Sequence, residues 1–364
     1  MLVAPSLGYL VLSPMLIVFA GAVLGVLVEA FMGKTHRAAV QFTISVGVLL
    51  ISLQQLWRIR DISSTTAAVD SVTIDKAGIF LQATVVLLAL IAVFLIADQD
   101  NFVAQASAVP GSNEEAIALQ QKNQQTEIFP LFLFAVAGMM LFPVATDLIT
   151  LFVALEVFSL PLYLLAGLSR RKRLLSQEAA LKYFLLGAYA SAFFLFGAAF
   201  LYGYAGTISI RGISAAAGSA NDVLLLIGIV FVSVGLLFKI SAVPFHSWTP
   251  DVYQGAPTPI TAFMAACTKV AAFGAILRIF YVGFAEAQTL WRPIITVIAI
   301  LTMVVGSVVA IAQRDVKRML AYSSIAHAGF LLSGVVALNK DGLAGSAESY
   351  QLDVSDQAAV FKVI

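Results

Sequence analysis

Long apolar runs separated by short polar segments dominate the chain. A helix that crosses the hydrocarbon core of a bilayer needs about 20 mostly apolar residues. Ten runs meet this requirement: 8–28, 38–56, 77–97, 128–144, 148–168, 179–201, 223–243, 260–284, 293–312 and 319–338. Their apolar positions do not alternate with polar ones, and an open sheet would leave backbone groups unpaired in lipid. The pattern therefore predicts an all-α polytopic membrane protein with about ten transmembrane helices.

The composition supports this class and argues against soluble ones. Of 364 residues, 60% are hydrophobic and 11% are charged, whereas about 25% are charged in an ordinary soluble domain. A net charge of +1 without a basic block gives no surface for nucleic acid. A single cysteine, Cys267, and three scattered histidines give no metal-ligand spacing. We therefore expect no cofactor and no metal in this chain.

The basic residues predict the orientation, because cytoplasmic loops are rich in lysine and arginine. The two densest clusters, 170–173 and 314–318, fall in loops on the same side of the predicted bundle, together with Lys34 and Arg37. We expect this side to be cytoplasmic, which places the N-terminus outside.

Three segments between or after the runs have their own predictions. Residues 98–127 are polar and rich in Gln and Ala, which predicts a mobile cytoplasmic loop without a packed core. Residues 207–213 alternate like a strand and predict a short outside hairpin. A polar stretch over 339–357 precedes a short apolar segment that ends at Ile364. That ending resembles the first turn of another helix, so we expect the chain to be incomplete.

Four ionisable residues lie well inside the apolar runs: Glu156, Lys182, Lys239 and Lys269. Such residues are costly in lipid and usually face a protein interior or a hydrated path. Glu156 lies about 13 Å beyond the expected N-cap Asp147, and Lys269 about 16 Å beyond the expected N-cap Thr258, at 1.5 Å per residue. Both positions are near the middle of the bilayer. Lys182 is shallower, and a lysine that extends to the cytoplasmic surface is the alternative there.

Lys239 immediately precedes a proline-rich segment. Pro244, Pro250, Pro257 and Pro259 lie within sixteen residues and cannot continue one helix. We expect helix seven to break here, with Pro244 leaving the carbonyl of Ile240 unpaired next to Lys239. A broken helix beside a buried charge is typical of an ion pathway. The alternative is an ordinary lysine at a helix C-terminus.

Glu156 has a similar neighbour, because Pro161 leaves the carbonyl of Val157 without its helical donor. A buried Glu–Lys pair could be structural, but three lysines against one glutamate exceed what a structural pair requires. Proton transfer is therefore the favoured interpretation. His327 and His246 are further relay candidates, since histidine titrates near neutral pH, although each is equally a candidate packing residue.

Three motifs carry a resemblance to a known family. They are the segment FKISAVPFHSWTPDVYQGAPTP at 238–259, RMLAYSSIAHAG at 318–329 and LEVFSLPLY at 155–163. Together they resemble the antiporter-like subunits of respiratory complex I, and the sequence YQGAP at 253–257 resembles the subunit N family of NADH-quinone oxidoreductase. The resemblance is close from about residue 126 to residue 338.

The resemblance implies a fold of fourteen helices with two inverted five-helix repeats, each containing a broken helix. On this basis 1–97 is an N-terminal three-helix segment, 98–127 the cytoplasmic loop, 128–284 the first repeat and 293–364 the incomplete start of the second. Helices eleven to fourteen are absent from the sequence. The resemblance also implies that Glu156 and Lys239 form a charged pair, that Lys182 assists them and that Lys269 leads toward the central axis.

The implied function is proton translocation across a bacterial inner membrane, coupled to quinone reduction in other subunits. NADH, FMN, iron–sulfur clusters and quinone would then lie in partner subunits. The implied partners are a neighbouring antiporter-like subunit, small membrane subunits and lipids, with no nucleic acid. Two alternatives remain at this point: a secondary sodium/proton antiporter, and a scaffold subunit that transports nothing.

Overall fold

The computed structural model describes residues 7–97, 111–120, 125–169, 173–216 and 222–337, and these are almost entirely helical. The α-helices are α1 (Tyr9–Phe31), α2 (Lys34–Ile59), α3 (Lys76–Ala97), α4 (Asn113–Gln120), α5 (Ile128–Leu141), α6 (Leu148–Ala166), α7 (Arg173–Ala205), α8 (Ile210–Ala215), α9 (Asp222–Ile240), α10 (Trp248–Gly255), α11 (Thr258–Phe263), α12 (Lys269–Arg278), α13 (Gln288–Ile311) and α14 (Val316–Ala337). Between α11 and α12 lies a π-helical segment, Met264–Thr268.

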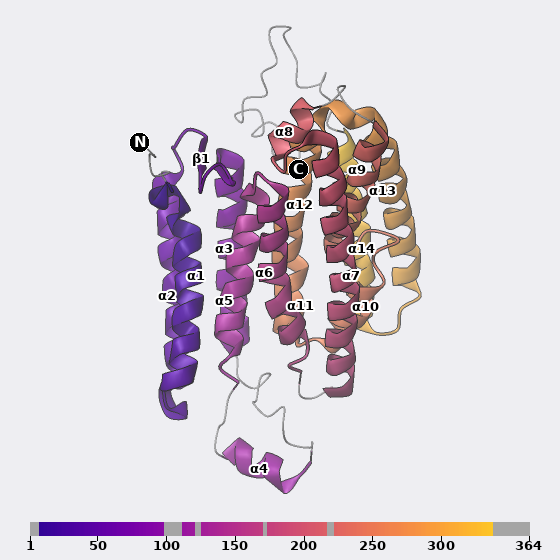
Figure 1. Ribbon diagram of the computed structural model, residues 1–364. Helices are drawn as coiled ribbons and strands as arrows, with labels where there is room; N and C mark the ends of the chain where they lie inside the picture. The colour runs from indigo at the N-terminus through magenta and orange to yellow at the C-terminus, as the bar shows by residue number, and fades with distance from the viewer. Residues whose placement is uncertain (1–6, 98–110, 121–124, 170–172, 217–221, 338–364) are drawn as a thin grey trace.

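The predicted transmembrane runs are confirmed as helices. Within the described residues, nine helices are long and apolar enough to cross a membrane, and a shorter apolar helix covers Ile128–Val144. Successive long helices run in opposite directions, and α2, α7 and α14 begin at the same end of the bundle as α4 (Figure 1).

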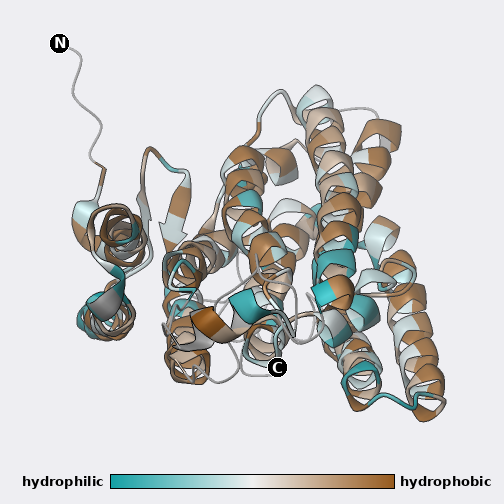
Figure 2. Ribbon diagram, turned by 90° about the horizontal axis from the view of Figure 1, so that it is seen from below, coloured by the Kyte–Doolittle hydropathy of each residue, from teal (hydrophilic) through white to brown (hydrophobic). Residues whose placement is uncertain are grey.

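The perimeter of the bundle is apolar, as a lipid-facing surface requires. Hydrophobic colouring covers most of the helices when the bundle is seen along its axis (Figure 2). Large side chains point outward along several of them, with 61% of Phe80, 59% of Leu164 and 63% of Val308 exposed. The centre is packed with aromatic rings, among them Phe132 and Phe263, whose ring centroids are 4.6 Å apart.

Two predicted segments differ from expectation. Within 98–127 the described part includes the helix α4. Residues 207–213 form no hairpin, because Ser209 accepts a hydrogen bond from the amide of Gly212 and so starts the helix α8. The only regular strands of the described chain are β1 (Thr65–Ala67) and β2 (Val72–Ile74), an antiparallel pair between α2 and α3. The expected further helix after residue 357 lies outside the described residues.

The break in helix seven is confirmed, but it precedes the prolines. The helix α9 ends at Ile240, and Ser241 adopts a left-handed backbone with φ of 66°. The amide of Ala242 donates to the carbonyl of Leu237 at 2.9 Å and that of Ser241 to Phe238 at 3.1 Å, which is a Schellman ending. The Trp248 indole also donates to the Phe238 carbonyl, at 3.1 Å. The helix is therefore stopped by a capped end, three residues before Pro244.

Candidate functional site

Lys239 is the most deeply buried of the predicted charges. It is the second-last residue of α9, and 2% of it is exposed. Its Nζ donates a hydrogen bond of 2.7 Å to the hydroxyl of Ser159 on α6. Ser159 in turn donates to the carbonyl of Leu155 on its own helix. The ammonium is thus held by one hydroxyl in an otherwise apolar interior.

Aromatic rings surround this ammonium. Its Nζ lies 5.3 to 5.8 Å from the centroids of four rings, those of Phe158, Tyr163, Phe238 and Tyr183. At such distances the negative faces of aromatic rings attract a cation. Tyr183 also stacks on Trp248 of α10, with centroids 4.6 Å apart and planes 8° from parallel. The second half of the broken helix therefore helps to hold the rings around Lys239.

Glu156 lies on the same face of α6 as Ser159, because the two are three residues apart. Its carboxylate accepts a hydrogen bond from Ser191 on α7. The carboxylate and the ammonium therefore have different partners. Among the ion pairs of the described residues, none joins Glu156 to Lys239. Two serines thus hold the two charges near one face of α6.

Lys269 is joined to a different helix. It follows the π-helical segment and is partly buried. Its Nζ donates to both the carbonyl and the hydroxyl of Ser324 on α14. Within the described residues, the structure gives no hydrogen bond between Lys239 and Lys269. The two buried lysines therefore bind different helices. Lys239 is hydrogen-bonded to α6, and Lys269 is hydrogen-bonded to α14.

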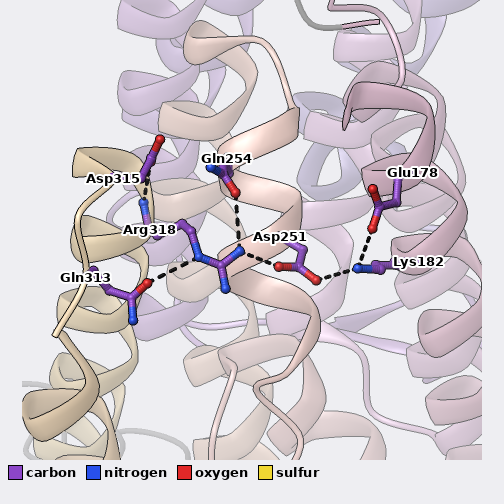
Figure 3. Close-up of polar contacts among 7 residues, drawn as sticks. All are labelled: Glu178, Lys182, Asp251, Gln254, Gln313, Asp315 and Arg318. Atoms are coloured by element: carbon purple, nitrogen blue, oxygen red, sulfur yellow. Dashed lines mark hydrogen bonds and ion pairs between the residues drawn. The ribbon is translucent and has the colours of Figure 1, made fainter. Parts of the chain in front are cut away.

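Lys182 belongs to a third group of charges, drawn in Figure 3. Its Nζ contacts Glu178 at 2.7 Å and Asp251 of α10 at 2.6 Å. The other oxygen of Asp251 pairs with Arg318 of α14, which also donates to Gln254 at 3.2 Å. The side chain of Lys182 is 41% exposed. Asp251 therefore ties the second half of the broken helix to α7 on one side and to α14 on the other.

The two cations decide the charge state of Asp251. Its partial burial raises the pKa of the carboxyl group, but the hydrogen bonds from Lys182 and Arg318 outweigh that effect and lower the pKa below its ordinary value. Asp251 is therefore a carboxylate at neutral pH, and both of its ion pairs are charged there.

Neither candidate histidine is hydrogen-bonded to a buried lysine. His246 lies in the break, and its ring centroid is 6.3 Å from that of Tyr322 on α14. Its Nδ1 is buried and has no hydrogen-bond partner. His327 is exposed on α14, and its Nδ1 is 2.7 Å from the carbonyl of Ser323. The structure brings neither histidine into contact with Glu156, Lys239 or Lys269.

Sequence reasoning did not single out the partners of these charges. Ser159, Ser191 and Ser324 each bind one of the predicted residues, and Asp251 and Arg318 complete the group around Lys182. Ser159 follows Glu156 by three residues, and this spacing was the available signal for it. The other partners come from different helices, and no spacing along the chain indicates them.

Comparison with known proteins identifies relatives. Residues 145–350 match the family model described as the NADH:quinone oxidoreductase/Mrp antiporter transmembrane region. The chain is 53% identical to NADH-quinone oxidoreductase subunit N of Thermobifida fusca, over 94% of this chain and 65% of that protein. It is 54% identical to subunit N of Rhodococcus opacus, over 94% of this chain and 68% of that one. The chain thus spans about two thirds of the length of these relatives.

Two solved structures contain chains that are similar to this one in fold. Respiratory complex I from Thermus thermophilus with bound aureothin contains a chain with a TM-score of 0.70 and 33% identity, covering 88% of this chain and 64% of that one. The Mrp complex from Dietzia contains one with a TM-score of 0.75 and 22% identity, covering 92% of this chain and 60% of that one. The second likeness is one of fold.

Proposed function

Since the chain belongs to the subunit N family of NADH-quinone oxidoreductase, a bacterial respiratory complex of the membrane, we propose that it translocates protons as a membrane-arm subunit of that complex. The observation that carries the proposal is Lys239. Burying an ammonium is costly unless the protein compensates it. Here the compensation is one hydroxyl and four rings, which hold a cation but leave its proton to be lost and regained.

The proton steps use groups already in place. Lys239 loses a proton to become a neutral amine, and Lys269 gains one to become an ammonium. Glu156, held by Ser191, is the acid on the same face of α6 as the Ser159 that binds Lys239. Lys182 stands at the cytoplasmic end, where Asp251 and Glu178 hold it, and His246 and His327 are relay candidates of lower rank.

The larger assignments are part of this proposal. The first repeat comprises 128–284 and the second begins at 293, with 1–97 as a separate three-helix segment and 98–127 as a cytoplasmic loop. The N-terminus lies outside, which the grouping of basic loops at one end supports. NADH, FMN, iron–sulfur clusters and quinone belong to partner subunits. A neighbouring antiporter-like subunit and small membrane subunits adjoin this one.

The test is NADH-driven proton uptake by inverted membrane vesicles, per NADH oxidised, with the complete subunit in the assembled complex. We expect Lys239→Met to lower uptake per NADH, or to abolish uptake and oxidation together while the complex remains assembled. The matched control is Lys34→Met, which removes an exposed lysine at the start of α2 and should change neither.

The same measurement separates the alternatives. Unchanged uptake and oxidation in Lys239→Met would make the buried lysine structural and would favour a scaffold role. Uptake that depended on sodium and continued without NADH oxidation would favour a sodium/proton antiporter.

A further inference from the structure

An apolar crevice opens between α2 and α3, far along the sequence from the buried lysines. Its volume is about 900 Å³, and it is lined by the last three turns of α2 and the first three of α3. Leu50 and Leu53 lie on one wall, and Phe80 and Leu87 on the other. Phe80 is 61% exposed and Leu50 is 52% exposed, so the crevice opens toward the perimeter of the bundle.

The length of the crevice matches one leaflet of a bilayer. Its lining extends from Leu50 to Arg60 on α2 and from Lys76 to Leu87 on α3. At 1.5 Å per residue, each wall is about 15 Å long, which is half of the roughly 30 Å hydrocarbon core. A groove of this length in a membrane-spanning bundle fits the acyl chains of one phospholipid.

The outer rim of the crevice is polar and basic. Arg60 and Lys76 line it there, with one acid, Asp61. The Arg60 guanidinium lies 3.9 Å from the centroid of Trp57, which places an amphipathic ring and a cation together at the rim. Asp61 pairs with Arg60 at 3.3 Å, and the two cations against this one acid leave a net positive charge at the rim. Tryptophan and arginine at this level are typical of the membrane interface.

We propose that the crevice between α2 and α3 binds an anionic phospholipid, with its acyl chains between the two helices and its phosphate on Arg60 and Lys76. Charge complementarity at the rim and the one-leaflet depth together favour this occupant over a protein segment. The proposal does not depend on proton transfer.

Trp57 provides a local probe of the crevice. It is 69% exposed, whereas the other two tryptophans, Trp248 and Trp291, are 2% and 0% exposed. Phospholipids with brominated chains quench tryptophan fluorescence on contact, so in a bilayer their quenching reports mainly on Trp57. The Trp57→Phe variant identifies that part of the signal.

The experiment compares quenching by brominated phosphatidylglycerol and brominated phosphatidylcholine, each mixed into phosphatidylcholine bilayers that contain the chain. One lysine or arginine near an anionic lipid surface is worth about a fivefold change in binding. With two cations and one acid at the rim, we expect about fivefold tighter binding of phosphatidylglycerol. The double variant Arg60→Gln/Lys76→Gln should lose this preference, and Arg58→Gln, on the same helix end but outside the crevice lining, should keep it.

Raising the salt concentration to about 1 M should also lower the preference in the unchanged chain, because exposed charges are screened. Equal quenching by the two lipids at low salt would overturn the proposal, as would a preference that survives the double substitution. Quenching of Trp57 by neither lipid would also overturn it.

Discussion

At the scale of single residues, the site depends on hydroxyl groups and on one glycine. Ser159 on α6 accepts a hydrogen bond from Lys239, and Ser191 on α7 donates one to Glu156. Tyr163, one of the rings around Lys239, has room only because residue 187 lacks a side chain. A Cβ at Gly187 would lie 2.1 Å from the Tyr163 hydroxyl oxygen. Gly187 is therefore a steric requirement of the aromatic surroundings of Lys239.

We expect Gly187→Ala to destabilise the protein by about 1–3 kcal/mol, the usual cost of overpacking a filled interior. The measurement is the thermal unfolding temperature of the purified protein. Gly203→Ala, on the same helix, is the matched control, since nothing lies within 4 Å of its would-be Cβ. It should be neutral or slightly stabilising.

A second substitution identifies the cause. Adding Tyr163→Phe to Gly187→Ala removes the closest atom and should restore part of the lost stability. If the double variant is no more stable than Gly187→Ala, the hydroxyl is not the source of the strain.

At the scale of elements, the broken helix is the feature that positions the site. The prolines of 238–259 predicted the break, because they cannot sit inside one helix. The left-handed Ser241 and the π-helical segment before Lys269 were not predictable. Serine rarely adopts this conformation, and Ser241 is held in it by Thr249 Oγ1, which donates to its hydroxyl at 2.6 Å. The local sequence therefore indicates where the helix ends, whereas contacts between elements determine the backbone conformation at that end.

Asp251 fixes the position of α10, and its charge gives a pH dependence. Its pKa is lowered in the folded protein. The stabilisation is therefore complete above the unfolded pKa of about 4 and is lost as the pH falls through the lower folded value. We expect Asp251→Asn to lower the unfolding temperature at pH 7, and the difference from the unchanged protein to shrink as the pH falls below about 4.

Glu178→Gln is the control, because it removes only the exposed pair with Lys182 on the same helix. Such pairs contribute little to stability, so its effect should be small at every pH. A difference between Asp251→Asn and the unchanged protein that stayed constant down to pH 3 would show that charge is not the cause.

At the scale of the whole molecule, a buried ion pair joins the N-terminal helices to the centre. Arg278 at the end of α12 contacts Asp75 at 2.9 Å, with 7% and 1% of their side chains exposed. Arg278 also donates to the carbonyl of Pro143 at 2.6 Å. Asp75 precedes α3 and accepts from the amide of Gly78. The two residues are 203 positions apart in the chain, and no local signal pairs them.

We expect Arg278→Met to cost about 3–5 kcal/mol, because it leaves the Asp75 carboxylate buried without its cation. Asp75→Asn combined with Arg278→Met should cost less than the sum of the two single substitutions. Asp61→Asn is the control, since its pair with Arg60 is exposed and should be worth no more than about 1 kcal/mol. Unfolding in denaturant measures all four variants, and additive costs would contradict the pairing.

The number of N–H groups on Lys269 determines whether its hydrogen bonds to Ser324 need the charged side chain. An ammonium has three N–H groups, and the neutral amine that remains after deprotonation has two. Both acceptors of Lys269 are atoms of one residue, Ser324, so two N–H groups suffice to keep both contacts. The same geometry therefore serves the charged and the neutral side chain. A neutral Lys269 would therefore keep both contacts that join α12 to α14.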